Sequence, residues 1–174
     1  MALIQRKSGV ARAAARREDF EVAPSDAWTR IADDAPLSEG PSLVSWARVQ
    51  RDRDALQARA DSIGVVIPND LSEDDLAGLL SFALIAIEFP KFRDGRGFTF
   101  ARWLRTRWGY QGELRAVGNV LRDQLLFMHR TGFDSFELTA GRDAHNALEA
   151  FGEQSVFYQA STDLPAPLWK RVSR

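Results

Sequence analysis

The chain has 174 residues, of which 45% are hydrophobic and 27% charged. This length and composition fit one compact domain and exclude a disordered or fibrous protein. No apolar run approaches the ~18 residues that a membrane span requires, and the first residues lack the apolar centre of a secretory signal. We therefore expect a cytoplasmic protein with no membrane partner. Because the chain has no cysteine, it cannot form disulfides or hold iron–sulfur clusters or zinc through thiolates.

The net charge of −1 conceals a segregation of charge along the chain. Residues 1–17 carry five basic side chains and no acid, and the stretch from Lys91 to Arg122 carries eight basic residues against two acids. Charge segregated in this way attracts anions. The alternative is that these arginines pair with acids from the remainder of the chain.

Short β-prone runs alternate with helix-compatible segments. Strands are predicted at residues 43–46, 64–68, 82–89, 112–118, 133–138 and 155–158, and helices at 47–60, 72–80, 100–108, 119–132 and 143–151. The run Phe82–Phe89 is almost continuously apolar, which is typical of a central parallel strand covered on both faces. Ser72 and Asn119 are suitable N-caps for the helices that follow them.

This alternation predicts an α/β fold with a mostly parallel sheet and right-handed crossovers. We favour a doubly wound layered sheet over an incomplete barrel-like arrangement, because the chain is short for a closed eight-stranded barrel. Residues 1–40 show no clear periodicity and are expected to form an arm or irregular lead-in. Residues 41–160 are expected to form a single α/β domain, and residues 161–174 a C-terminal extension that lies on the surface from Pro165 onward.

The loop 90–97 is the first candidate site, because α/β proteins bind ligands where strands lead into helices. Its run Asp94-Gly-Arg-Gly97 permits a tight turn and leads into a helix whose first amides are unpaired. These amides and the side chains of Lys91 and Arg96 predict a site for a phosphate, a carboxylate or a sulfur oxyanion. The alternative is a loop fixed by an ion pair between Asp94 and an arginine.

Arg115 is the second feature of interest, because its apolar neighbours in the strand suggest that it is buried. A buried arginine needs an acid or a ligand anion. Glu88 and Glu137 on the adjacent strands would supply acids in a structural Glu–Arg–Glu ladder. Alternatively, Arg115 reaches the strand ends, and the loops 90–99 and 118–124 lie side by side there.

The candidate site residues follow from these two loops. The candidates for anion binding are Lys91, Arg96, Gly97, Arg115, Asn119 and Gln124, and the candidates for proton transfer are Asp94 and Asp123. His129 and His145 lack metal-ligand spacing, so no metal site is expected. Aromatic residues and arginines alternate between residues 98 and 108, but the pI of about 6.1 and the core-like spacing of the aromatics argue against nucleic-acid binding.

Several short motifs resemble a bacterial family of unknown function. They are Phe89-Pro-Lys-Phe92, Asp94-Gly-Arg-Gly97, Ala101-Arg102, Leu104-Arg105, Gly112-Glu-Leu-Arg-Ala116, Asp123-Gln124, Gly132-Phe-Asp134 and Tyr158-Gln159. The resemblance is dense over residues 82–138 and looser over 27–81. The family is described as a predicted oxidoreductase involved in sulfite reduction, encoded beside assimilatory sulfite reductase. Asn119 stands where an aspartate is expected in this family.

The resemblance implies two alternative functions. The first is an accessory protein of assimilatory sulfite reduction that binds sulfite reductase or another sulfur-assimilation protein. Its anionic ligand would be sulfite, a phosphorylated metabolite or a carboxylate-rich tetrapyrrole. The second is an oxidoreductase in which Asp94 or Asp123 transfers protons, while Lys91, Arg96 and Arg115 hold an anionic substrate, a nucleotide or a flavin. No redox motif or cofactor can be identified in the sequence.

Overall fold

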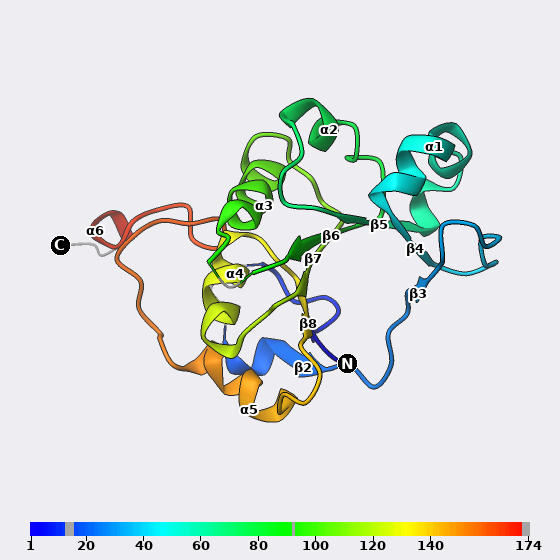
Figure 1. Cartoon of the computed structure of the whole chain (residues 1–174). Coiled ribbons are helices and arrows are strands. Elements are labelled where there is room, and N and C mark those ends of the chain that lie inside the picture. The colour runs from blue at the N-terminus through cyan, green and yellow to red at the C-terminus, as the bar shows by residue number, and fades with distance from the viewer. Residues whose placement is uncertain (13–15, 92, 172–174) are drawn as a thin grey trace.

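The computed structural model describes residues 1–12, 16–91 and 93–171, and these form an α/β fold (Figure 1). The described residues build one eight-stranded sheet in the order β2-β1-β8-β7-β6-β5-β4-β3. The strands are β1 (Ala2–Arg6), β2 (Phe20–Val22), β3 (Thr29–Arg30), β4 (Ser42–Ser45), β5 (Ile63–Ile67), β6 (Leu84–Phe89), β7 (Glu113–Gly118) and β8 (Ser135–Leu138). The α-helices are α1 (Trp46–Gln57), α2 (Glu73–Ala77), α3 (Arg96–Thr106), α4 (Leu125–Thr131), α5 (Ala144–Leu148) and α6 (Leu168–Arg171). The 3₁₀ helices are η1 (Arg17–Asp19), η2 (Ala60–Ser62), η3 (Arg122–Gln124) and η4 (Glu149–Gly152).

The mostly parallel sheet predicted from the sequence is confirmed. Strands β3 to β8 run parallel to one another, whereas β1 is antiparallel to both β2 and β8. The apolar run forms the interior strand β6, in which every residue except Glu88 is buried. Ser72 caps α2 as expected, because its side chain accepts a hydrogen bond from the Asp75 amide.

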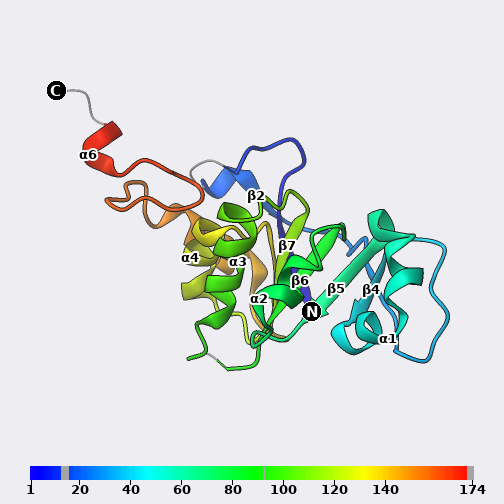
Figure 2. The same cartoon turned by 90° about the horizontal axis from the view of Figure 1, so that it is seen from above.

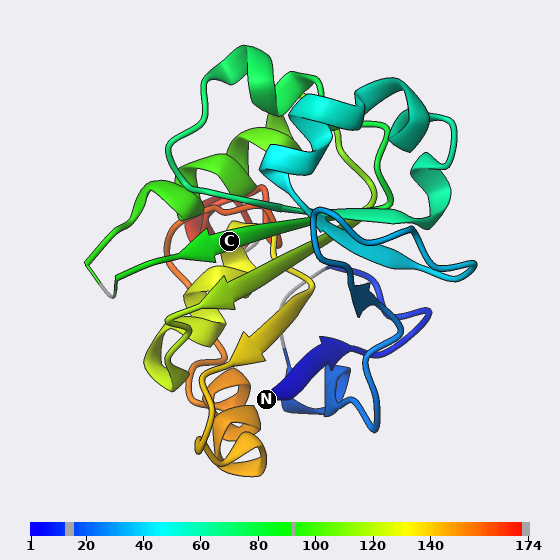
Figure 3. The same cartoon turned by 45° about the vertical axis from the view of Figure 1, so that its right-hand side comes forward.

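The sheet curls into a half-barrel, which corrects the preference for a doubly wound layered sheet (Figure 3). Strands β2 and β3 form opposite edges, yet only residues 23–28 join them. The seven steps from Val22 to Thr29 can span at most about 25 Å. The edges of a flat eight-stranded sheet would lie about 34 Å apart. The connection is therefore too short for a flat sheet.

The two faces of the sheet differ in their packing. One face carries the main hydrophobic core, to which the helices contribute residues such as Val49, Phe100 and Met128. The opposite face, which we call the concave face, holds a small apolar cluster of Leu43, Leu84, Ala86 and Val117 with Trp28 and Val66 packed against it. Helices on both faces, as in a doubly wound sheet, are not seen among the described residues.

The N-terminal segment is part of the sheet, contrary to the irregular lead-in expected for residues 1–40. Strand β1 lies between β2 and β8, and Ile4 and Phe20 are fully buried. The ring of Phe20 stacks on that of Phe151 with centroids 3.8 Å apart. These strands are short, and their partner β8 lies far along the chain, so no local periodicity reveals them.

Two further predictions need correction. Residues 155–158 form no strand and instead belong to an arm that includes α6 and projects from the rest of the chain (Figures 1 and 2). The predicted helix 119–132 is replaced by η3 followed by α4, whose N-cap residues are Leu121 and Gln124 rather than Asn119. Residues 172–174 of the predicted C-terminal extension lie outside the described residues.

Candidate functional site

The two loops that were expected to adjoin do lie side by side at the carboxyl edge of the sheet. Strands β6 and β7 are paired, and the Asn119 amide donates to the Phe89 carbonyl at 2.8 Å. Lys91 and Asp123 are exposed, whereas Asn119 and Gln124 are partly buried. Phe92, the last residue of the motif that begins at Phe89, lies outside the described residues.

Asp94 and Arg96 form the ion pair that was considered as the alternative to an anion site. Arg96 Nε and Nη2 donate to the two carboxylate oxygens of Asp94 at 2.9 and 2.7 Å. The hydrogen bond from Arg96 holds the pKa of Asp94 well below its ordinary value. Asp94 is therefore ionised at neutral pH and is a poor proton donor.

Gly97 is required by packing rather than by a bound anion. It lies at the start of α3 and is buried against β6. A Cβ at this position would lie 2.7 Å from Phe89 Cζ and 3.2 Å from Ile87 Cγ2. The absence of a side chain lets α3 approach the sheet closely.

Arg115 lies away from the other candidates, on the concave face near the amino end of β7. Its side chain is 2% exposed and pairs with Asp26 at 2.6 Å and with Glu113 at 3.0 Å. The expected ladder is wrong, because Glu137 pairs with Arg30 and Glu88 is exposed. Asp26 belongs to the connection that joins the two sheet edges, so Arg115 fastens this connection over the concave face.

A second cluster, which the sequence patterns did not reveal, lies at the opposite end of the parallel strands, at the amino end of β8. Asp134, just before β8, pairs with three arginines, and its side chain is only 8% exposed. Arg6 at the end of β1 donates to it at 2.8 Å, Arg12 at 2.7 Å and Arg105 of α3 at 2.5 Å. The Leu114 amide donates to the same carboxylate at 3.1 Å.

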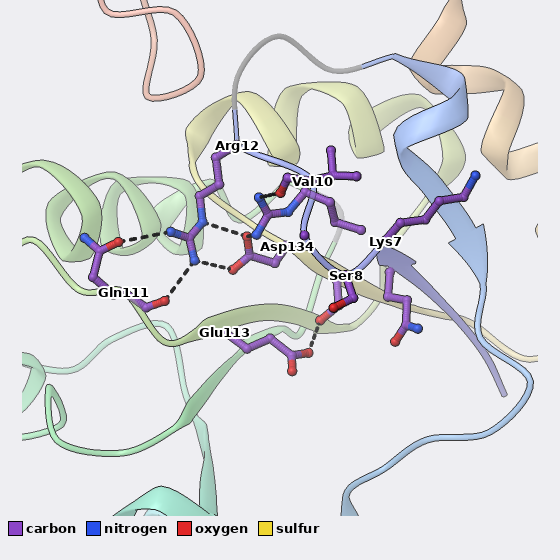
Figure 4. Close-up of a pocket in the computed structure, with 11 residues that line it drawn as sticks. Lys7, Ser8, Val10, Arg12, Gln111, Glu113 and Asp134 are labelled. Carbon is purple, nitrogen blue, oxygen red and sulfur yellow. Dashed lines mark hydrogen bonds and ion pairs between the residues drawn. The ribbon is translucent and has the colours of Figure 1, made fainter.

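This cluster borders a pocket of about 280 Å³, which we call the arginine pocket. It is lined by Gln5, Arg6, Lys7, Ser8, Gly9, Val10, Arg12, Gln111, Glu113, Asp134 and Ser135. Figure 4 shows Arg12 between Asp134 and Gln111, with Lys7 and Ser8 on the other side of Asp134. The Ser135 hydroxyl donates to Glu113 Oε1 at 2.5 Å, and Glu113 in turn pairs with Arg115.

The arginine pocket carries uncompensated positive charge. Three guanidiniums share the one carboxylate of Asp134, which leaves an excess of two positive charges in the cluster. Of the other charged residues that line the pocket, Lys7 adds one positive charge, and Glu113, which shares Arg115 with Asp26, adds one negative charge. Burial lowers the pKa of Arg105 to about 10, and the charge of Arg12 also lowers it. Burial and the charge of Arg12 likewise lower the pKa of Arg6. Burial would raise the pKa of Asp134, but the hydrogen bond from Arg12 and the charge of Arg105 bring it below its ordinary value.

One buried donor in this cluster has no partner. Arg6 Nε is buried and makes no hydrogen bond to any of the described residues. A buried donor without a partner is costly. The basic residues of the N-terminal segment are visible in the sequence, but their convergence on Asp134 is not, because Arg6 and Asp134 lie 128 positions apart.

The comparisons with known proteins concern the family of the chain. Residues 64–169 match a family described as "Bacterial protein of unknown function (DUF934)". The chain belongs to this family. The matched region includes both loops at the carboxyl edge and two members of the arginine cluster, Arg105 and Asp134, whereas Arg6 and Arg12 precede it. Searches of curated proteins and of solved structures found no match.

The residues that the structure describes contain no helix that is both long and apolar enough to cross a membrane. They also contain no group of three or more His, Asp or Glu side chains arranged to hold a metal ion.

Proposed function

We propose that this protein binds a small oxyanion in the arginine pocket and acts in the cytoplasm as an accessory protein of assimilatory sulfite reduction. The observation that carries the proposal is the excess of positive charge around Asp134, next to an open pocket. An anion in this pocket would relieve the repulsion among the guanidiniums.

The size of the arginine pocket favours a small ligand. Its volume of about 280 Å³ lies just below the range for small-molecule sites, which runs from about 300 to 1,000 Å³. A flavin or a dinucleotide would exceed it, whereas an oxyanion of sulfur or a small phosphorylated metabolite would fit. The side chains of Ser8 and Gln111 supply further polar groups at the rim.

The link to sulfur assimilation rests on the sequence resemblance. Sulfite is a compact oxyanion, and its charge suits a pocket lined by Arg6, Lys7 and Arg12. The expected partner is sulfite reductase or another sulfur-assimilation protein. No observation favours the oxidoreductase alternative, because Asp94 is held ionised by Arg96 and Asp123 is exposed.

The direct test is thermal unfolding and calorimetric titration with sulfite, sulfate, phosphate and chloride at constant ionic strength. We expect sulfite to stabilise the wild-type protein and to bind in a saturable manner. Arg12→Gln should abolish this response, whereas Arg96→Gln, which removes an arginine at the opposite edge, should leave it intact. Lys7→Ala, which removes no ion pair seen in the structure, should weaken binding and provides a second variant if Arg12→Gln is unstable.

The outcomes separate the alternatives. An unchanged sulfite response in Arg12→Gln and Lys7→Ala would overturn the arginine pocket as the site. Loss of the response in Arg96→Gln alone would return the site to the loop 90–97. Saturable binding of NADPH or a flavin would favour the oxidoreductase. Normal growth on sulfate after deletion of the gene would overturn the pathway assignment.

A further inference from the structure

Residues 155–171, which we call the C-terminal arm, are anchored firmly at their base. The hydroxyls of Ser161 and Thr162 donate to the Arg130 carbonyl at 2.5 and 2.6 Å. The Arg130 guanidinium donates to the Gln159 carbonyl at 2.9 Å and lies 3.9 Å from the ring centroid of Phe157. These contacts hold the base of the arm against Arg130, near the end of α4.

Two aromatic side chains are exposed on the arm, Tyr158 at its base and Trp169 in α6 (Leu168–Arg171), which we call the tip. Tyr158 and Trp169 are 65% and 58% exposed, and their ring centroids lie 5.1 Å apart. The Leu168 amide donates to the Tyr158 carbonyl at 3.0 Å, which closes the arm on itself. Both views place α6 well away from α4 (Figures 1 and 2). A preformed, exposed aromatic pair of this kind is typical of an interaction surface.

The tip is also basic. Lys170 and Arg171 are exposed beside Trp169, and Arg171 Nη2 donates to the Phe157 carbonyl of the same arm at 2.6 Å. The acid within the arm, Asp163, is buried and pairs with Arg130 at 3.4 Å. The surface that binds this tip should therefore be apolar with an acidic rim.

A groove with these properties lies beside the base of the arm. It has a volume of about 350 Å³, and Leu126, Phe127, Ala150 and Phe157 supply its apolar lining. Phe127 is 54% exposed. The acids of the groove are Asp123, which is exposed, and Glu153, which pairs with Arg122 at 2.6 Å, and the charge of its one lining base, Arg130, is matched by Asp163. We call it the acidic groove.

We propose that the C-terminal arm of one copy inserts its tip into the acidic groove of a second copy, giving a two-fold dimer. The tip and the groove are complementary in both apolar character and charge. They adjoin the same anchor, Arg130, so a two-fold axis near this residue places each arm over the groove of the other copy. Trp169 is the central contact, and Lys170 and Arg171 face Asp123 and Glu153.

The test is analytical ultracentrifugation of the full chain from micromolar to submillimolar concentrations, without added ligand. We expect a dimer whose dissociation constant rises at least about 30-fold in Trp169→Ala, since tryptophan hot spots have effects of this size. The double variant K170E and R171E should weaken the dimer similarly, whereas Lys91→Glu, an exposed charge change elsewhere, should not. Because these side chains are exposed, urea unfolding should show unchanged stability of the monomer.

A mixing experiment tests the geometry. Trp169→Ala retains its groove, and the double variant D123K and E153K retains its arm, so only the mixture can form one intact arm–groove contact. We expect the mixture to contain dimer at concentrations where each variant alone is monomeric. A monomeric wild type, or a dimer insensitive to both sets of substitutions, would overturn the proposal, including the case in which the arm binds a different protein.

Discussion

Replacing Asp134 by asparagine tests the electrostatic account of the arginine pocket. The substitution keeps the shape of the side chain but removes the carboxylate that Arg6, Arg12 and Arg105 share. Because Asp134 is 8% exposed, its loss leaves buried positive charge without a partner, which typically costs about 3–5 kcal/mol. For a chain of this size, the melting temperature should fall by roughly 6–20 °C.

Urea unfolding at several pH values measures this loss. The pKa of Asp134 is lowered in the folded state, so the folded protein binds fewer protons there than the unfolded protein. Its contribution is therefore present above about pH 3.9 and is lost as the pH falls through the lower folded pKa. Asp134→Asn should show a weaker dependence of stability on pH in that acidic range.

The same variant connects stability with anion binding. Its excess of positive charge rises by one, so added sulfate or sulfite should restore more stability to Asp134→Asn than to the wild type. If Asp134→Asn lowers the free energy of unfolding by less than about 1 kcal/mol, water screens the guanidiniums well and their mutual repulsion is weak. An anion response equal to that of the wild type would refute the reasoning in the same way.

Three further substitutions probe the scaffold by urea unfolding. Gly97→Ala should lower the free energy of unfolding by about 1–3 kcal/mol, because its Cβ would lie 2.7 Å from Phe89 Cζ. The control Gly95→Ala, whose Cβ would have no atom within 4 Å, should change it by less than about 0.5 kcal/mol. Equal effects of the two substitutions would contradict the packing role of Gly97. Arg115→Met should lower the free energy of unfolding by roughly 3 kcal/mol and speed proteolytic cleavage within residues 23–28. Unchanged cleavage would show that the ion pair between Arg115 and Asp26 does not fasten this connection. Tyr110→Phe should cost about 1 kcal/mol, since the buried hydroxyl donates to the Phe82 carbonyl at 2.8 Å, and a stability equal to the wild type would argue against that bond.

Features that depend on neighbouring residues were predictable from the sequence. The apolar run of β6, the Ser72 cap and the alternation of strands and helices all follow from local patterns. The Asp94–Arg96 ion pair is equally local, since the two residues lie two positions apart. The adjacency of the two loops follows from the rule that consecutive parallel strands pair.

Features that depend on distant pairs were not predictable. The sequence by itself determined the fold class, the central strand and the basic character of the N-terminal segment. Only the tertiary structure decided that the sheet curls, because the constraint is the short link between two edge strands whose positions no local pattern reveals. It also decided that Arg6 and Arg12 meet Asp134, more than 120 positions away. Such long-range pairs depend on the strand order, which brings β1 beside β8, and the strand order is a property of the whole fold.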